Sequence, residues 1–90
     1  MLYVRHTVGS RLFYETTEYE IKPSDHGWEI SFNTDNETAA TLLKFHNELN
    51  IFYVEENQKT WFYSSEGIVE FLEDQSKLLI YADHKTAYPV

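Results

Sequence analysis

Aromatic side chains must build much of the core of this chain. It has 90 residues and no cysteine, yet two Trp, seven Tyr and six Phe make 17% of it aromatic. A chain of this size buries only about 60–65% of its unfolded surface, and aromatic side chains bury the most area per residue. We therefore expect a single domain over residues 1–90, with no linker.

The absence of cysteine excludes disulfides, thiolate zinc sites and cysteine nucleophiles. A chain without disulfides suits a reducing compartment, so we expect a cytoplasmic location, in the host cell if a phage encodes the chain. The residues after Met1 lack the charged and apolar regions of a signal peptide. Apolar runs such as 51–54 are too short to cross a membrane, so we expect no membrane association.

Alternating apolar and polar residues predict a first hairpin. Residues 2–8 alternate, and Gly9-Ser10 has the chemistry of a two-residue turn, because glycine accepts a positive φ. A second strand is expected over residues 11–22. The turn would pair Val8 with Arg11.

A third strand is expected over residues 28–32, after a loop at 23–27 that contains both proline and glycine. The expected register places Glu20 opposite Glu29 on the outward face. Like charges directly opposite each other are mildly destabilising, so this acidic outer face is a candidate for function.

A helix is expected from Thr34 to about Asn50. Thr34 and Glu37 match a capping box, in which each side chain satisfies a free backbone N–H group. Apolar residues recur on one side of this helix at its natural spacing. They are Ala39, Leu42, Leu43, Phe45, His46 and Leu49.

Residues 51–56 and 60–64 predict a hairpin that turns at 57–58. Its two faces are both rich in aromatic residues, which is unusual for a hairpin with one side in water. Either helices cover both faces or one face binds a partner. Tyr53 and Phe62 share a face, and we take them as candidate anchors because aromatic residues dominate protein interfaces.

The remaining sequence predicts a second helix over residues 66–75, a strand over 77–82 and a polar tail over 84–90. The element order is then β-β-β-α-β-β-α-β. This order indicates an α+β domain, built mainly on an antiparallel sheet with two helices.

The chain is strongly acidic, with 15 Asp+Glu against 7 Lys+Arg and a formal net charge of −8. Residues 48–74 hold seven acids and one base. On the expected second helix, Glu66, Glu70 and Glu73 recur about 5–6 Å apart, similar in spacing and sign to nucleic-acid phosphates. The solvated side of an ordinary helix can carry the same row, and both interpretations stay open.

An acidic surface beside aromatic anchors predicts a site for a partner protein. The candidate partner-binding residues are Glu55, Glu56, Glu66, Glu70, Glu73, Asp74, Tyr53 and Phe62.

No residue pattern indicates catalysis, a metal or a cofactor, so we expect none of the three. His6 and His46 fall on apolar faces and are expected to be hydrogen-bonded core residues. Adjacent carboxylates such as Glu55 and Glu56 point to opposite sides of a strand and cannot share a substrate. The three glycines are isolated from one another, so they form no phosphate-binding loop.

The leading hypothesis is a non-enzymatic protein that binds a basic site on a larger protein, such as a nuclease or nucleic-acid-binding protein. A net negative chain is repelled by nucleic acids and anionic lipids, so we expect no direct binding to either. In composition and size alone, the chain is similar to phage proteins that block nucleases by imitating DNA and to bacteriocin immunity proteins. That similarity suggests an inhibitor such as an anti-CRISPR or anti-restriction protein.

Two alternatives remain open. The first is an immunity or antitoxin-like protein that neutralises one cognate toxin. The second is a homodimeric accessory subunit, in which an exposed edge strand or aromatic face mediates assembly. We therefore expect either a monomer or a homodimer.

Overall fold

The computed structural model describes residues 1–25 and 27–89, and within them it contains nine strands, one α-helix and one 3₁₀ turn. The elements are β1 (Leu2–His6), β2 (Leu12–Thr16), β3 (Glu20–Ser24), β4 (Gly27–Asn33), α1 (Asn36–Lys44), β5 (Leu49–Val54), β6 (Gln58–Tyr63), β7 (Ile68–Leu72), η1 (Glu73–Gln75), β8 (Lys77–Ala82) and β9 (His84–Pro89). The fold is α+β with antiparallel strand pairing, as predicted, but the second helix and the element order differ.

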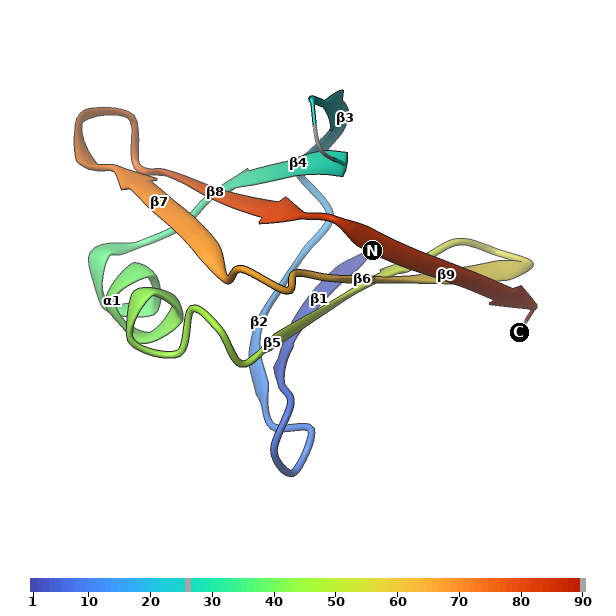
Figure 1. The fold of residues 1–90 in the computed structure, drawn as a ribbon. Helices are drawn as coiled ribbons and strands as arrows, with labels where there is room; N and C mark the ends of the chain where they lie inside the picture. The colour runs from blue at the N-terminus through green and yellow to red at the C-terminus, as the bar shows by residue number, and fades with distance from the viewer. Residues whose placement is uncertain (26, 90) are drawn as a thin grey trace.

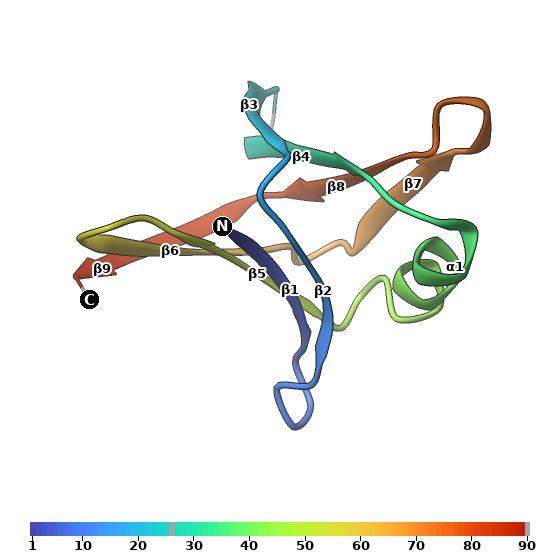
Figure 2. The same cartoon turned by 180° about the vertical axis from the view of Figure 1, so that it is seen from behind.

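The strands form two sheets (Figure 1). The five-stranded sheet has the order β2-β1-β5-β6-β9, and the four-stranded sheet has the order β3-β4-β8-β7. The chain crosses between the sheets four times, at residues 17–19, through the segment 34–48 that contains α1, at residues 64–67 and at Asp83. Helix α1 leads from β4 to β5 and packs beside β2 and β7, as the rear view shows (Figure 2).

The core lies between the two sheets and is aliphatic at its centre. Among the described residues, the only aromatic side chains that are buried are Phe32 and Phe62. The other aromatic rings surround this centre, as where Trp28 meets Phe62 edge-on at 5.8 Å between ring centroids. The largest fully buried side chains of the described residues are Leu2, Val4 and Ile51 from the five-stranded sheet, Ile30, Leu78 and Ile80 from the four-stranded sheet, and Leu42 from α1.

The first predicted helix is confirmed, although it begins one residue later and ends earlier than expected. Asp35, not Thr34, is the N-cap, and its Oδ1 accepts a hydrogen bond from the Thr38 N–H at 2.6 Å. That bond holds the pKa of Asp35 below its ordinary value. The helix ends at Lys44, so His46 lies in the turn before β5.

The predicted second helix over residues 66–75 is wrong. Residues 68–72 form β7, and η1 follows directly. In β7, Val69 lies opposite Ile80 and Phe71 opposite Leu78, so these two residues face the core while Glu70 points outward. The pair Ile68-Val69 is β-branched and therefore favours a strand over a helix.

The predicted tail over residues 84–90 is also wrong where it is described, because residues 84–89 form β9 and pair with β6. Val90 lies outside the described residues, as does His26 of the predicted 23–27 loop.

The β1–β2 and β5–β6 hairpins turn at other residues than predicted, and their strand registers shift accordingly. The loop after β1 spans residues 7–11, and Arg5 lies opposite Leu12 across an irregularity in the ladder. The loop after β5 spans residues 55–57 and places Phe52 opposite Trp61. In the β5–β6 hairpin the register differs from the predicted one by two residues. Each side chain therefore stays on the side of the sheet that was predicted for it.

The long strand predicted over residues 11–22 is two strands, β2 and β3, which belong to different sheets. β3 also continues through Pro23, which sits on an edge strand, where a proline is tolerated. The predicted Glu20–Glu29 opposition does not occur. Lys22 lies opposite Glu29, and its Nζ forms a salt bridge with Glu20 at 3.2 Å.

Candidate binding surfaces

The two sheets divide the charge of the molecule unequally. Residues 17–33 and 64–83 build the four-stranded sheet and the segments joined to it. These two ranges hold nine of the 15 Asp+Glu and two of the 7 Lys+Arg, so they carry −7 of the net charge of −8. Most of the net charge is therefore carried by one sheet and its connections, which are built from two distant parts of the chain, and only part of the acidity expected between residues 48 and 74 belongs to it.

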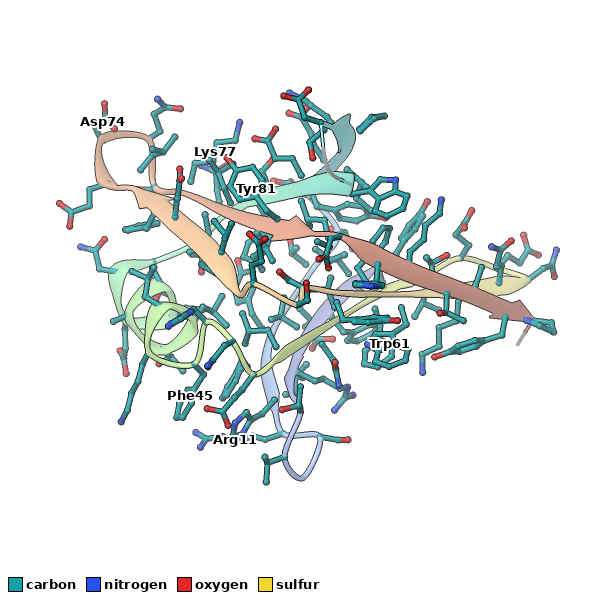
Figure 3. All side chains as sticks on the ribbon, viewed as in Figure 1. Arg11, Phe45, Trp61, Asp74, Lys77 and Tyr81 are labelled. Carbon is teal, nitrogen blue, oxygen red and sulfur yellow. The ribbon has the colours of Figure 1, made fainter. Side chains whose placement is uncertain are left out.

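The outward side of the four-stranded sheet, which we call the acidic face, carries Glu20, Glu29 and Glu70 together with Lys22 and Lys77 on its strands, and Glu66 at its border. Tyr81 lies on this face opposite Glu29, and burial raises its pKa, with further contributions from the carboxylates of Glu70 and Glu29. Figure 3 shows Tyr81 and Lys77 along β8, with Asp74 at the far turn. Leu79, only 7% exposed, closes the centre of the face.

One end of the acidic face is hollowed by a cavity of about 290 Å³. Its apolar wall includes Ile68, which is 43% exposed, together with Tyr81 and Ala82. Carboxylates border the same space. They belong to Asp25, Glu66 and Asp83. An apolar wall under a rim of carboxylates matches the long aliphatic stem and charged end of a lysine or arginine side chain.

The eight candidate residues predicted from the sequence do not form one patch. Glu66 and Glu70 belong to the acidic face, and Glu73 and Asp74 lie in η1, beyond the end of β7. Glu55 and Glu56 lie in the β5–β6 turn. The two views place this turn and the β7–β8 turn at opposite ends of the molecule (Figures 1 and 2).

A second cavity, of about 500 Å³, brings three of the predicted residues together where the two sheets part. They are Tyr53, Glu55 and Phe62. Phe62 is 3% exposed and packs in the core, so it offers almost no surface to a partner. Tyr53 meets Tyr19 edge-on at 5.5 Å, and burial and a hydrogen bond with Tyr53 raise the pKa of Tyr19.

The side of the β5–β6 hairpin that faces away from the other sheet is also aromatic, and its rings at Phe52, Trp61 and Tyr63 are half-buried. Outward side chains of the five-stranded sheet form an aromatic face. It consists of Tyr3, Phe52, Trp61, Tyr63, His84 and Tyr88. Figure 3 shows Trp61 below β6, on the side of the five-stranded sheet that faces away from the four-stranded sheet. Alternation of aromatic residues over 51–63 predicted two aromatic faces, but only tertiary packing decides which of them is covered.

The rings of the aromatic face stack on one another. Phe52 and Trp61 lie 6.5 Å apart at 19°, Trp61 and Tyr63 4.5 Å apart at 31°, and Tyr63 and His84 4.7 Å apart at 8°. Lys59 covers Phe52, with its Nζ 4.4 Å from the ring centroid. The Trp61 Nε1–H group donates to Asn50 Oδ1 at 3.0 Å.

Both histidines that were expected to be core residues are hydrogen-bonded, but only His6 is partly buried, and His46 is exposed because the helix ends before it. His6 Nε2 lies 3.0 Å from Glu48 Oε1, and the His6 ring packs against both Phe13 and Phe45, which stack on each other. His46 Nδ1 lies 2.7 Å from the carbonyl oxygen of Gly67. Among the described residues, no three His, Asp or Glu side chains converge as metal ligands do.

Asp83 fixes the corner between β8 and β9. Its carboxylate accepts hydrogen bonds from the Ser65 hydroxyl and from the Ser65 N–H at 3.0 Å, and it contacts His84 Nδ1 at 2.6 Å. The Ser65 bonds, with His84, lower the pKa of Asp83 from 3.8 to about 2.

Because the folded state lowers this pKa, the Asp83 contacts stabilise the protein above pH 3.8, and their contribution is lost as the pH falls toward about 2. We expect Asp83→Asn to unfold at lower urea concentration than the wild type at about pH 6, and the difference to shrink at about pH 2.5. Asp74→Asn, in an exposed turn, is the control. A difference that is the same at both pH values would contradict this role for Asp83.

Within the described residues, the structure has no helix that is long and apolar enough to cross a membrane. Comparison with known proteins found no matching family model, no similar curated protein and no similar solved structure.

Proposed function

We propose that this protein is a non-enzymatic inhibitor that docks its acidic face onto a basic site of a larger protein. The narrower form of the proposal is an anti-defence protein of the kind phages encode, such as an anti-CRISPR or anti-restriction protein. It would mask the basic site of a nuclease or DNA-binding protein by imitating nucleic acid, in the cytoplasm of the host cell.

The observation that carries the proposal is the concentration of −7 charges on residues 17–33 and 64–83, which together form one sheet and its connections. Charges concentrated in one sheet and its connections produce a directed field, which raises the rate of encounter with a surface of opposite sign. An even distribution of the same residues would support solubility without selecting a partner.

The cavity beside Ile68 and Tyr81 supports a more specific contact. A lysine or arginine of the partner would lay its aliphatic stem on these two side chains and reach Glu66 with its charged end. Individual exposed ion pairs contribute only about 0–1 kcal/mol, so the carboxylates act mainly in steering and orientation. The apolar contact at Ile68 and Tyr81 would slow dissociation, because it removes apolar surface from water.

Reversal of two charges on the acidic face tests the proposal. After capture of a partner from host lysate, the rate at which the purified partner associates is measured by surface plasmon resonance at several salt concentrations. We expect Glu66→Lys combined with Glu70→Lys to lower this rate on the order of 10-fold at low salt and to flatten its salt dependence.

The control is Glu55→Lys combined with Glu56→Lys, which makes the same change in net charge in the distant β5–β6 turn. Equal loss in both double variants would show that net charge, not the acidic face, governs binding. Unchanged binding in the Glu66/Glu70 variant would reject the proposal. Displacement of the partner by duplex DNA would support imitation of nucleic acid, whereas a partner indifferent to DNA would favour the immunity or antitoxin-like alternative.

A further inference from the structure

Strand β9 is an open edge of the five-stranded sheet. All six of its residues, His84–Pro89, are exposed. It pairs with β6 on one side, and no other described strand pairs with its second side. Both views show β9 extending with the β5–β6 hairpin away from the rest of the fold (Figures 1 and 2). Backbone N–H and C=O groups along a free edge are a template for another strand.

The other three sheet edges carry the features that normally block such pairing. β2 has an irregular register with β1, and α1 packs beside it. β3 contains Pro23 and the charged pair Glu20–Lys22. β7 lies against α1. Proline, charged side chains, irregular register and covering helices are the recognised ways in which proteins protect an edge.

β9 has little of this protection. Its one lysine, Lys85, is drawn to the inner side of the sheet, where its Nζ lies 4.8 Å from the centroid of the Trp28 ring. Pro89 stands at the end of the strand, and the two middle positions hold the small residues Thr86 and Ala87. The middle of β9 is therefore free of bulky or charged groups that would keep a second strand away.

The distribution of charge indicates that a second copy of this chain can pair with the free edge of β9. Each of the other edge strands contains an acid, namely Glu15 in β2, Glu20 in β3 and Glu70 in β7, whereas β9 contains none. In a chain with a net charge of −8, β9 is thus the edge where a second copy meets no opposing carboxylate on the pairing strand. The acidic face belongs to the other sheet, so pairing here keeps the two acidic faces apart.

We propose that β9 is the edge through which two copies of this chain associate, with β9 antiparallel to β9 of the second copy across a two-fold axis. The five-stranded sheets of the two copies then form one continuous sheet. Directly paired residues point to the same side, so the aromatic faces of the two copies also become continuous. The proposal is independent of the inhibitor function, because it concerns a different surface.

A single strand pair with its flanking side chains buries less than about 1,200 Å², which is typical of weak, concentration-dependent association. We therefore expect the weight-average sedimentation coefficient to rise from the monomer toward the dimer value between roughly 10 and 500 µM. Over the same range, backbone amide NMR signals should shift in residues 84–89. A sedimentation coefficient that stays at the monomer value throughout would overturn the proposal.

Ala87→Lys places two lysines near each other at the centre of the pairing and should raise the dimer dissociation constant at least about 10-fold. Ala40→Lys is the matched control, since Ala40 is exposed on α1 and should leave dimerisation unchanged. A dimer that survives Ala87→Lys overturns the proposal. So do concentration-dependent amide shifts at Phe52 and Trp61 with none in β9. The wild-type NMR dilution decides the matter even if Ala87→Lys fails to fold.

Discussion

Replacing Leu42 with alanine is expected to lower the free energy of unfolding by about 2–5 kcal/mol. Leu42 is 0% exposed and is the side chain through which α1 enters the core between the two sheets. A helix of nine residues is too short to be stable alone, so α1 depends on this burial. The substitution removes buried methyl groups and leaves a cavity that neighbouring side chains fill only in part.

Leu43 provides a control in the next position of the same helix. It is 38% exposed, so Leu43→Ala should cost less than about 1 kcal/mol. Urea unfolding followed by circular dichroism measures both variants. Equal losses would mean that α1 does not pack on the core through Leu42.

The element types that the sequence predicted correctly are those with one unambiguous period. Residues 28–32 alternate over a length that only a strand explains, and Asp35 to Lys44 combines a cap with a helical stripe. Residues 77–82 were also predicted as a strand and form β8.

The second helix was mispredicted because Ile68, Val69, Phe71 and Leu72 fit two periods. Four apolar residues in a run of five satisfy the helical spacing, and they also fit a strand that has a core on one side and partly covered apolar residues on the other. The tertiary contact with β8 selects the strand. A short apolar run carries no signal that reveals such a partner in advance.

β9 was missed for a different reason. None of its residues is buried, so no apolar periodicity marks it, and it is held as a strand by backbone pairing with β6. Sequence patterns report burial, and an edge strand exposed on both sides lacks that signal.

The acidic surface was predicted in sign but not in place. The seven acids between residues 48 and 74 lie in one stretch of the sequence, yet the chain leaves the five-stranded sheet after Tyr63 and enters the other sheet at Ile68. Glu55 and Glu56 are separated from Glu66 and Glu70 by this crossing. The acids that do join Glu70 on one face, Glu20 and Glu29, come from the first third of the chain, and only the sheet order brings them there.

The crossing itself depends on Gly67, and replacing this residue with alanine should destabilise the fold by about 2 kcal/mol or more. Gly67 is buried and has a φ of +64°, which side chains other than glycine rarely adopt. A Cβ atom at this position would lie 2.7 Å from Asn47 Cα and 3.0 Å from the carbonyl oxygen of His46. Because these neighbours are backbone atoms, the clash can be relieved only by moving the turn that joins α1 to β5.

Gly9→Ala separates the two causes of the Gly67→Ala destabilisation, which are backbone strain at positive φ and the clash of the added Cβ atom. Gly9 has a similar φ of +76°, but a Cβ atom there would have no neighbour within 4 Å, so its substitution carries the backbone strain alone, about 1–2 kcal/mol. Urea unfolding should therefore show a clearly larger loss for Gly67→Ala than for Gly9→Ala. Equal losses would indicate that the Gly67 segment does not press against residues 46–47. A larger loss would show that the segment carrying Glu66 and Ile68 to the acidic face is fixed by direct contact with the turn after α1.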